Sequence, residues 1–162
     1  MEEVHYCNDP GKVRVFEGVP KALQALRAAG FRTVLVTNQN GIAKGLISQN
    51  QYESVHTRLL EQLGPDTLDA AYMCADPAGQ PSERRKPAPG MLLEATQDLR
   101  LDLGRSWIIG DKAIDIACGK NAGIPGILVR TGYGRAEERE AGAAWVAETF
   151  AEAVNWLLER RA

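Results

Sequence analysis

The sequence predicts a three-layer α/β fold, in which helices cover both faces of a parallel β-sheet. Segments with the helical spacing of apolar residues alternate along the chain with short apolar runs that are typical of buried strands. Such alternation favours parallel strands joined by right-handed crossovers. Polar stretches that follow the strands should then gather at the carboxyl edge of the sheet. The length of 162 residues indicates one domain, residues 1–162.

Five helices are expected where apolar residues recur at intervals of three or four. In chain order they cover residues 20–30, 48–64, 89–99, 112–123 and 147–161. Gly30 and Gly64 stand at the ends of the first two, where glycine commonly terminates a helix. Ser48 and Gln51 have capping-box spacing at the start of the second. Pro89 opens the third, a position that suits proline because the first turn needs no N–H donor.

Four buried strands are expected from short apolar runs. They cover residues 33–36, 68–74, 106–110 and 126–130. The first ends at Thr37 and Asn38, and the third ends at Asp111. Three segments that follow strands have no regular pattern, namely residues 38–47, 75–89 and 131–142. We expect these irregular segments to lie at the carboxyl edge of the sheet, where open α/β proteins bind ligands.

The composition excludes several classes of partner. With 19 Lys and Arg against 21 Asp and Glu, the net charge is -2, so the chain lacks the basic excess of proteins that bind nucleic acids or anionic membranes. No run approaches the roughly 18 apolar residues of a membrane span, and the N-terminus has no signal-peptide pattern. Three cysteines, an odd number, argue against a disulfide framework. These features predict a cytoplasmic protein with a small-molecule ligand and carry no information on oligomeric state.

The polar residues at the strand ends suit a phosphate group and a divalent cation. Thr37 supplies a hydroxyl and Asn38 an amide, the second irregular segment carries Lys86, and Asp111 follows the third strand. Lysine and amide donors neutralise phosphoryl oxygens. A carboxylate is a hard oxygen ligand for Mg²⁺, which keeps several waters in most protein sites. The pattern therefore favours a phosphate site that uses Mg²⁺.

The segments "VLVTNQNGIAKG", "RRKPAPGMLLEA" and "WIIGDKAIDIACGKNAGI" resemble motifs II, III and IV of the haloacid dehalogenase superfamily of phosphatases. They are most similar to its branch of heptose-bisphosphate and histidinol-phosphate phosphatases. The resemblance implies a Rossmann-like sheet without a large cap domain, and a Mg²⁺-dependent phosphoric monoester hydrolase. It implies a small phosphorylated metabolite as substrate. The first candidate is D-glycero-D-manno-heptose 1,7-bisphosphate, cleaved at position 7, and the second is histidinol phosphate.

The resemblance also implies roles for individual residues. Thr37 and Asn38 would bind the transferring phosphoryl group, Lys86 would neutralise the phosphorylated aspartate, and Asp111 would bind Mg²⁺. Asp115, one helical turn further on, would orient the lysine at position 112 or complete the outer shell of the metal. The remaining candidate substrate-binding residues are Lys44, Arg85 and Lys112.

Structural interpretations compete with these roles. Thr37 and Asn38 suit an ordinary turn after a strand, and the basic run at residues 84–86 suits a solvated surface. Asp111 is a good N-cap for the helix that follows, a role that does not exclude metal binding. Lys44 is equally compatible with a solvated loop. The three motifs, in order and on the expected strand ends, favour a phosphate site over these interpretations taken jointly.

The first motif of the superfamily, an apolar strand that ends in Asp-x-Asp-Gly, has no counterpart in this sequence. In the family its first aspartate attacks phosphorus and its second acts as general acid and base. Asp9 follows no apolar run and has no second carboxylate two residues on, so we reject it as the nucleophile. We therefore expect an inactive chain whose sheet lacks its central strand. Three explanations stay open: a sequence truncated at a misassigned internal start, an inactive relative (one that could still bind phospholigands) whose other strands close the gap, or a position filled by another segment or chain.

Relatives in this branch often carry a zinc loop of the form C-x-H…C-x-C between motifs II and III. Here Cys74 is retained, and Asp76, Ser82 and Arg84 occupy the other aligned positions. Because arginine does not bind zinc, we expect no zinc site. The prolines of this loop and its contacts with the rest of the protein should shape it instead.

Overall fold

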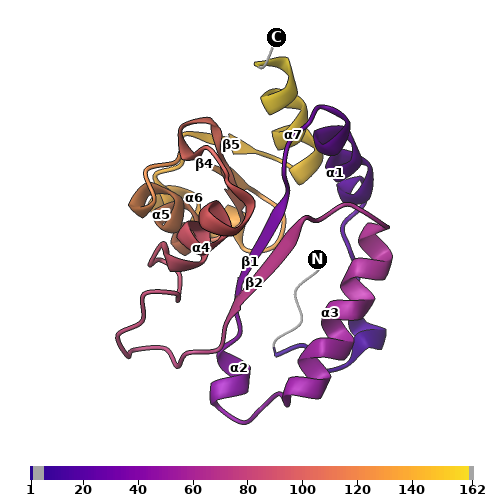
Figure 1. Ribbon diagram of the computed structural model, residues 1–162, viewed down its shortest axis with the longest axis vertical. Helices are drawn as coiled ribbons and strands as arrows, with labels where there is room; N and C mark the ends of the chain where they lie inside the picture. The colour runs from indigo at the N-terminus through magenta and orange to yellow at the C-terminus, as the bar shows by residue number, and fades with distance from the viewer. Residues whose placement is uncertain (2–5, 161–162) are drawn as a thin grey trace.

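Two parallel sheets form the centre of the protein, as the computed structural model shows for Met1 and residues 6–160 (Figure 1). In the first sheet, β1 (Val34–Asn38) pairs with β2 (Ala70–Cys74). The second sheet has the order β3-β4-β5. Its strands are β3 (Ile108–Gly110), β4 (Gly126–Val129) and β5 (Trp145–Ala147). The parallel pairing confirms the predicted α/β class.

Helices connect the strands, as parallel pairing requires. Their bounds are α1 (Val19–Ala28), α2 (Asn40–Ala43), α3 (Gln49–Leu63), α4 (Gly90–Leu99), α5 (Ala113–Asn121), α6 (Gly134–Ala141) and α7 (Phe150–Glu159), with short 3-10 turns at Pro10–Lys12 and Leu103–Arg105. The predicted capping box forms at α3, because Ser48 and Gln51 each bond the main chain of the other. Gly30 and Gly64 follow α1 and α3 with φ of 80° and 91°, which glycine adopts without steric cost. No described helix is long and apolar enough to cross a bilayer.

The second sheet is the middle of three layers. Ile127 of β4 packs in one apolar cluster with Leu157 of α7, whereas the next residue, Leu128, packs with Ile116 of α5. Alternate side chains of a strand point to opposite faces, so α7 covers one face and α5 the other. All four residues of β4 are buried, which is typical of a parallel strand between two helical layers.

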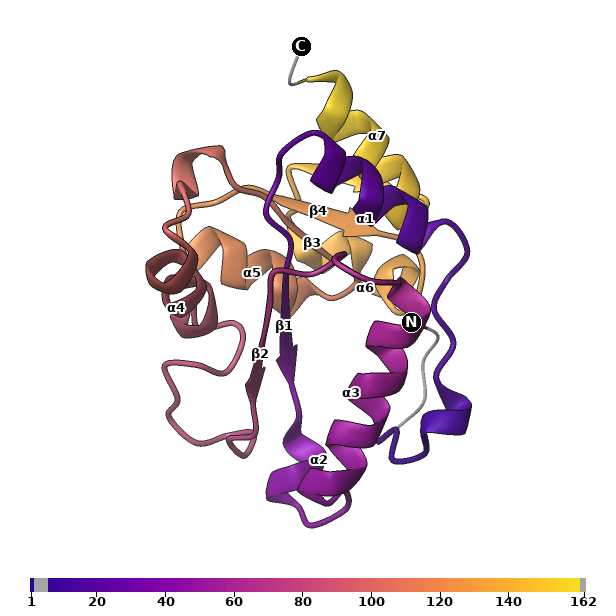
Figure 2. The same cartoon turned by 45° about the vertical axis from the view of Figure 1, so that its right-hand side comes forward.

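The two sheets are not hydrogen-bonded to each other. Within the described residues no strand is hydrogen-bonded between β1 and β3. On one side the sheets are joined by packing, because Val36 of β1 contacts the cluster around Ile108, Cys118 and Ile124. In Figure 2, β1 and β2 run down the picture and β4 runs across it, so the strand direction turns from one sheet to the other.

Helices α2 and α6 and strand β5 were not predicted. We expected residues 38–47 to be irregular, and this is wrong for the one-turn helix α2. We expected residues 131–142 to be irregular, and this is wrong for α6, which covers Gly134–Ala141. The glycines suggested a turn, but Gly134 is the first residue of the helix, where a Cβ would lie only 1.8 Å from the carbonyl oxygen of Val129. Strand β5 is only three residues long, and its last residue, Ala147, was wrongly expected to begin the C-terminal helix, which starts at Phe150. No inserted cap domain interrupts the described chain, as the sequence predicted.

Candidate active site

The carboxyl ends of β1, β3 and β4 open on one cavity of about 1450 Å³. The polar residues at this end of the cavity include Thr37, Asn38, Lys86, Asp111, Lys112, Asp115, Thr131 and Tyr133. They come from four separate segments of the chain. Thr37, Lys86 and Asp111, each predicted from a different motif, therefore share one cavity.

Lys86 is held by two acceptors at the centre of this edge. Its Nζ lies 2.7 Å from Oδ1 of Asp115 and 3.0 Å from the carbonyl oxygen of Val36. The side chains of Lys86 and Asp115 are 11% and 10% exposed, so the ion pair is largely removed from water. Because the Lys86 ammonium is already held in position, it can bind an anionic ligand with little reorganisation of the protein.

Asp115 is fixed by the start of α5. Its Oδ2 accepts a hydrogen bond from the main-chain N–H of Lys112 at 3.1 Å, which forms the second half of a capping box. Gly110 permits this arrangement, because a Cβ there would lie 2.4 Å from Cβ of Asp115. The carboxylate therefore orients the Lys112 backbone and the Lys86 ammonium at once. The sequence suggested that Asp115 orients Lys112, but it did not predict the ion pair between Asp115 and Lys86.

Asn38 holds the main chain of Lys86. Its Nδ2 donates to the carbonyl oxygen of Lys86, and its Oδ1 accepts from the N–H of Lys86, both at 3.1 Å. The neighbouring Thr37 accepts a hydrogen bond from Nε2 of Gln39 at 3.1 Å. The amide of Asn38 thus joins motif II to motif III.

Asp111 is the carboxylate most available to a cation. Its Oδ2 accepts the N–H of Tyr133 at 3.1 Å. Burial, and the nearby carboxylate of Asp115, raise the pKa of Asp111 above its ordinary value, and the positive charges of Lys112 and the amino terminus oppose this shift. A divalent cation next to Asp111 would stabilise the ionised carboxylate and so counteract the effects of burial and of Asp115.

Lys112 and the aromatic ring of Tyr133 form a second contact at this edge. The ammonium of Lys112 lies 3.7 Å from the ring centroid, within the range of a cation–π interaction. The contact places a positive charge at the mouth of the cavity, and no carboxylate of Met1 or residues 6–160 forms a salt bridge with that ammonium. An anionic ligand would meet this charge as it enters.

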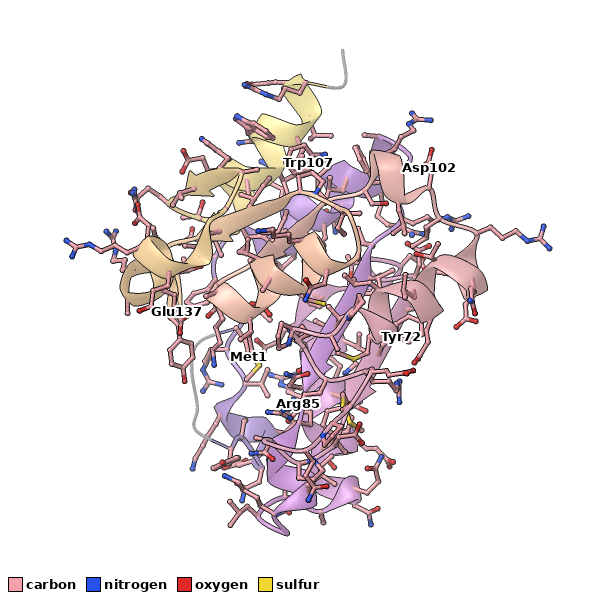
Figure 3. The ribbon with its side chains drawn as sticks, turned by 90° about the vertical axis from the view of Figure 1, so that its left-hand side faces the viewer. Met1, Tyr72, Arg85, Asp102, Trp107 and Glu137 are labelled. Atoms are coloured by element: carbon pink, nitrogen blue, oxygen red, sulfur yellow. The ribbon has the colours of Figure 1, made fainter. Side chains whose placement is uncertain are left out.

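Two predicted substrate-binding residues do not line the cavity. Arg85 donates from Nη1 to the carbonyl oxygen of Asp76 at 2.9 Å, and Figure 3 shows Arg85 on the loop that follows β2. Lys44 lies after α2, where its Nζ is 3.0 Å from the hydroxyl of Tyr6. Both residues lie on segments that begin at the carboxyl ends of β1 and β2, so a larger ligand that extends from the cavity would approach these segments.

Hydrogen bonds hold the loop where relatives often have zinc ligands. Oγ of Ser82 donates to Oδ2 of Asp76 at 2.5 Å and accepts the N–H of Arg85 at 2.9 Å. Sγ of Cys74 lies 3.9 Å from the same hydroxyl. Two of the residues aligned with zinc ligands therefore bond each other. Within Met1 and residues 6–160, no three His, Cys, Asp or Glu side chains are grouped closely enough to hold a metal ion by themselves.

The residues present fit a Mg²⁺ ion that is shared with a phosphate, and they do not form a closed protein cage. Asp115 is already engaged by two donors, so Asp111 is the candidate carboxylate ligand. Mg²⁺ is commonly held by one or two carboxylates, with waters and substrate phosphates completing its shell. A single carboxylate beside a lysine-lined cavity meets that requirement in part.

Comparison with known proteins assigns the family. A family model described as HAD-hydrolase-like matches residues 83–153. A D-glycero-D-manno-heptose-1,7-bisphosphate 7-phosphatase of Thermosynechococcus vestitus is 37% identical over 175 residues, which cover 96% of this chain and 89% of the relative. The chain belongs to the haloacid dehalogenase superfamily of phosphatases. This membership confirms the predicted family and class of enzyme.

Other members of the superfamily support the same branch. A D-glycero-beta-D-manno-heptose-1,7-bisphosphate 7-phosphatase of Yersinia pestis is 37% identical over 158 residues, covering 91% of this chain and 84% of the relative. The crystal structure of a D,D-heptose 1,7-bisphosphate phosphatase from B. bronchiseptica, complexed with magnesium and phosphate, superposes with a TM-score of 0.87. It is 28% identical and covers 95% of this chain and 89% of its own. A putative HAD-like phosphatase from Mesorhizobium loti gives a TM-score of 0.78 at 31% identity, covering 97% of this chain and 78% of its own.

Three residues of this haloacid dehalogenase site were not predicted. Tyr133 and Thr131 reach the cavity from the loop after β4, and Gln39 bonds Thr37. The loop after β4 was expected at this edge, so its position was a usable signal for Thr131 and Tyr133. Gln39 carried no such signal, because amide side chains are common in turns.

Proposed function

We propose that this protein provides the phosphate- and Mg²⁺-binding part of a phosphatase for D-glycero-D-manno-heptose 1,7-bisphosphate, with the 7-phosphate at the cavity mouth. One observation carries the proposal: the buried Lys86–Asp115 pair lies in the same cavity as Thr37 and Asp111. Relatives that are 37% identical over most of the chain bear the name of this activity. A reduced cytoplasmic location is part of the proposal, and the three free cysteines support it.

Each side chain has a defined task in this proposal. The ammonium of Lys86 and the hydroxyl of Thr37 bind phosphoryl oxygens, and Asn38 keeps the Lys86 backbone in place. Asp111 holds the cation. When bound, Mg²⁺ supplies positive charge that neutralises phosphoryl oxygens. Lys112 meets the phosphate at the cavity mouth, while Lys44 and Arg85 interact with the parts of the ligand that extend further out.

The sequence contains no Asp-x-Asp pair, so we infer that residues 1–162 by themselves bind the phosphate ester without hydrolysing it. A carboxylate nucleophile and an acid–base carboxylate are the groups that the covalent route requires. Asp115 is committed to Lys86, and Asp111 is committed to the cation. Neither is free to attack phosphorus.

An N-terminal extension tests this function. We would add an apolar strand that ends in Asp-x-Asp before Met1 and measure phosphate release with Mg²⁺ from the heptose bisphosphate. Activity in the extended chain, and none when the first added aspartate is replaced by asparagine, is the expected result. An extended chain that folds and binds Mg²⁺ yet releases no phosphate from any phosphosugar would contradict the proposal.

Two alternative functions can be distinguished from this proposal, the first with the same extended chain. Faster release of phosphate from histidinol phosphate than from the heptose bisphosphate would assign the second candidate substrate. The other alternative is a non-catalytic protein that binds phospholigands, which the missing Asp-x-Asp pair favours. The DNA upstream of the Met1 codon separates it from the enzyme: an in-frame apolar run ending in Asp-x-Asp-Gly indicates the enzyme, and a stop codon immediately upstream indicates the binding protein.

A further inference from the structure

Three consecutive residues of motif IV contact the segment that begins α6. The main-chain N–H of Tyr133, the residue before this helix, donates to Oδ2 of Asp111 at 3.1 Å. The centroid of the Tyr133 ring lies 3.7 Å from Nζ of Lys112. Oε2 of Glu137, in the first turn of α6, accepts the N–H of Ala113 at 3.0 Å. One short segment therefore contacts the candidate cation ligand and the two residues that follow it.

The contact made by Glu137 satisfies the start of α5. The first N–H groups of a helix have no acceptor within that helix, and the helix dipole favours a carboxylate near them. The N–H of Lys112 is bonded by Asp115, which belongs to α5 itself, whereas the N–H of Ala113 is bonded by Glu137. Figure 3 shows Glu137 on α6, the helix that packs beside α5. The position of the start of α5 thus depends on a side chain of another helix.

The main chain before α6 lies directly against Asp111. A Cβ at Gly132 would overlap Oδ2 of Asp111, so no space separates this segment from the carboxylate. A movement of α6 towards motif IV would displace the carboxylate, and a movement away would break its hydrogen bond with Tyr133. The place of Asp111 is therefore tied to the place of α6.

Arg130, which follows β4, fixes α6 to the second sheet. Its Nε and Nη2 donate to the two carboxylate oxygens of Glu138 at 2.8 and 2.7 Å, a planar arrangement of two parallel bonds that sets the direction of the pair. Nη1 of Arg130 and Nη2 of Arg135 both donate to Glu148, which follows β5. Glu137 and Glu138 are neighbours in the sequence, but the first bonds the start of α5 and the second bonds the end of β4. Helix α6 is therefore held between the sheet and motif IV.

We propose that Glu137 is a positioning residue: through the N–H of Ala113 it fixes the start of α5, and with it the side chains of Asp111 and Lys112. The proposal rests on the proposed function in one respect, since it takes Asp111 as the ligand of the cation. Glu137 does not line the cavity, so its effect on a bound ligand is indirect. Groups that hold the surroundings of a metal ligand commonly change metal affinity by roughly 10–100-fold.

A purely electrostatic role for Glu137 is the competing interpretation. A carboxylate on α6 would attract a cation at Asp111 whether or not it bonds the main chain of Ala113. Two substitutions separate the charge of the side chain from its length. Glu137→Gln keeps the length and an oxygen acceptor but removes the charge, whereas Glu137→Asp keeps the charge and shortens the side chain by one methylene group.

Mg²⁺ affinity is the first measurement. Calorimetric titration with Mg²⁺ at saturating inorganic phosphate should give a Kd roughly tenfold higher for Glu137→Ala and Glu137→Asp than for the unmodified chain, and within about threefold of it for Glu137→Gln. Ser48→Ala is the control for lost stability, because it removes the capping box of α3 and does not line the cavity. Its Mg²⁺ affinity should be unchanged. If Glu137→Gln is as weak as Glu137→Ala while Glu137→Asp binds normally, the effect is electrostatic and the proposal is wrong.

Amide hydrogen exchange of the ligand-free chain is the second measurement, and it does not depend on binding. The N–H of Tyr133 reports how firmly Asp111 is held, because that carboxylate is its acceptor. Glu137→Asp should speed exchange roughly tenfold at Ala113, which loses its acceptor, and at Tyr133, whose acceptor is retained. Glu137→Gln should exchange at the unmodified rate at both positions. The control is Ala136→Gly, which weakens α6 at an exposed position, keeps Glu137 and should leave exchange at Ala113 unchanged.

The two measurements separate this inference from the proposed function. If the unmodified chain does not bind Mg²⁺ but exchange follows the expected pattern, the cation site is wrong and Glu137 still positions Asp111. If Mg²⁺ binds the unmodified chain and every Glu137 variant with equal affinity, the cation site stands and the positioning role is wrong. Exchange at Tyr133 that is unchanged in Glu137→Asp would also overturn the proposal. Should Glu137→Ala fail to fold, the comparison of Glu137→Gln with Glu137→Asp decides the outcome.

Discussion

Lys86 and Asp115 form an ion pair of 2.7 Å in which each side chain is about nine-tenths buried. The two residues lie 29 positions apart, on the loop before α4 and in the first turn of α5. Burial removes both charges from water, so each depends on the other for its stability in the fold. A change in either residue should therefore affect both the stability of the protein and the position of the Lys86 ammonium in the cavity.

Asp115→Asn should lower the free energy of unfolding by about 3–5 kcal/mol, because it leaves the Lys86 ammonium buried without a counter-charge. Urea denaturation followed by circular dichroism measures the change. The control is Glu61→Gln, which breaks the exposed Arg58–Glu61 pair, whose side chains are 48% and 56% exposed. That change should cost less than about 1 kcal/mol. Equal costs for the two variants would show that the buried pair has no special role.

Asn38→Ala should destabilise the protein by about 1–3 kcal/mol, because two hydrogen bonds to the main chain of Lys86 are lost. Amide hydrogen exchange at Lys86 should become faster in the variant. Asn121→Ala is the matched control, since Asn121 makes one exposed hydrogen bond, to the carbonyl of Pro87 at 2.9 Å. If exchange at Lys86 is the same in both variants, Asn38 does not hold this backbone.

Gly110→Ala should cost about 1–3 kcal/mol through overpacking, since the new methyl group would meet Asp115 at 2.4 Å. Asp115 must then move away from Lys86, so the variant should also bind inorganic phosphate more weakly. Calorimetric titration with phosphate measures the second effect. Gly104→Ala is the control, because its Cβ would lie at 3.3 Å from an exposed carboxylate oxygen of Asp102. A stable Gly110→Ala chain with unchanged phosphate affinity would contradict the close contact.

Asp69 should make the protein sensitive to acid. Burial raises the pKa of this carboxyl, but hydrogen bonds from Arg27, the N–H of Thr33 and Arg32 outweigh it and lower the pKa from 3.8 to about 2. The pKa of Asp69 is lower in the folded state than in the unfolded state. The ionised carboxylate therefore adds about 2 kcal/mol to the free energy of unfolding above pH 3.8, and this stabilisation is lost as the pH falls towards 2. Urea unfolding of Asp69→Asn should show a weaker pH dependence in that range. Asp98→Asn, which removes an exposed carboxylate that accepts a hydrogen bond from the hydroxyl of Tyr72, is the control for the loss of one surface charge.

Mg²⁺ with inorganic phosphate should raise the melting temperature of the unmodified chain, because ligands that bind the native state stabilise it by mass action. Asp111→Asn should abolish the Mg²⁺-dependent part of this rise, since it removes the proposed carboxylate ligand. Differential scanning calorimetry with and without each ion separates the two contributions. Asp66→Asn is the control at an exposed position with φ of 56°, which asparagine tolerates. A Mg²⁺ response that survives in Asp111→Asn would place the cation elsewhere.

Local patterns in the sequence were sufficient for most of the fold. The capping box of Ser48, the terminating Gly30 and the apolar runs of β1 and β4 each depend on residues close together in the chain. Helix α6 escaped prediction because the glycines at its start also suit a loop. The close approach of Gly134 to the carbonyl of Val129 is a tertiary contact that no local pattern records.

The sequence by itself determined the order of four strands and five helices, the motifs that carry Thr37, Lys86 and Asp111, and the lack of an Asp-x-Asp pair. Only the tertiary structure decided that Asp115 pairs with Lys86, that Asn38 holds the Lys86 backbone, and that the described strands form two separate sheets. The physical reason is range. The spacing of apolar residues and the helix-capping residues reflect interactions between residues close together in the sequence. The contacts made by Asp115 and Asn38 depend instead on how helices and loops separated by tens of residues pack against the sheets.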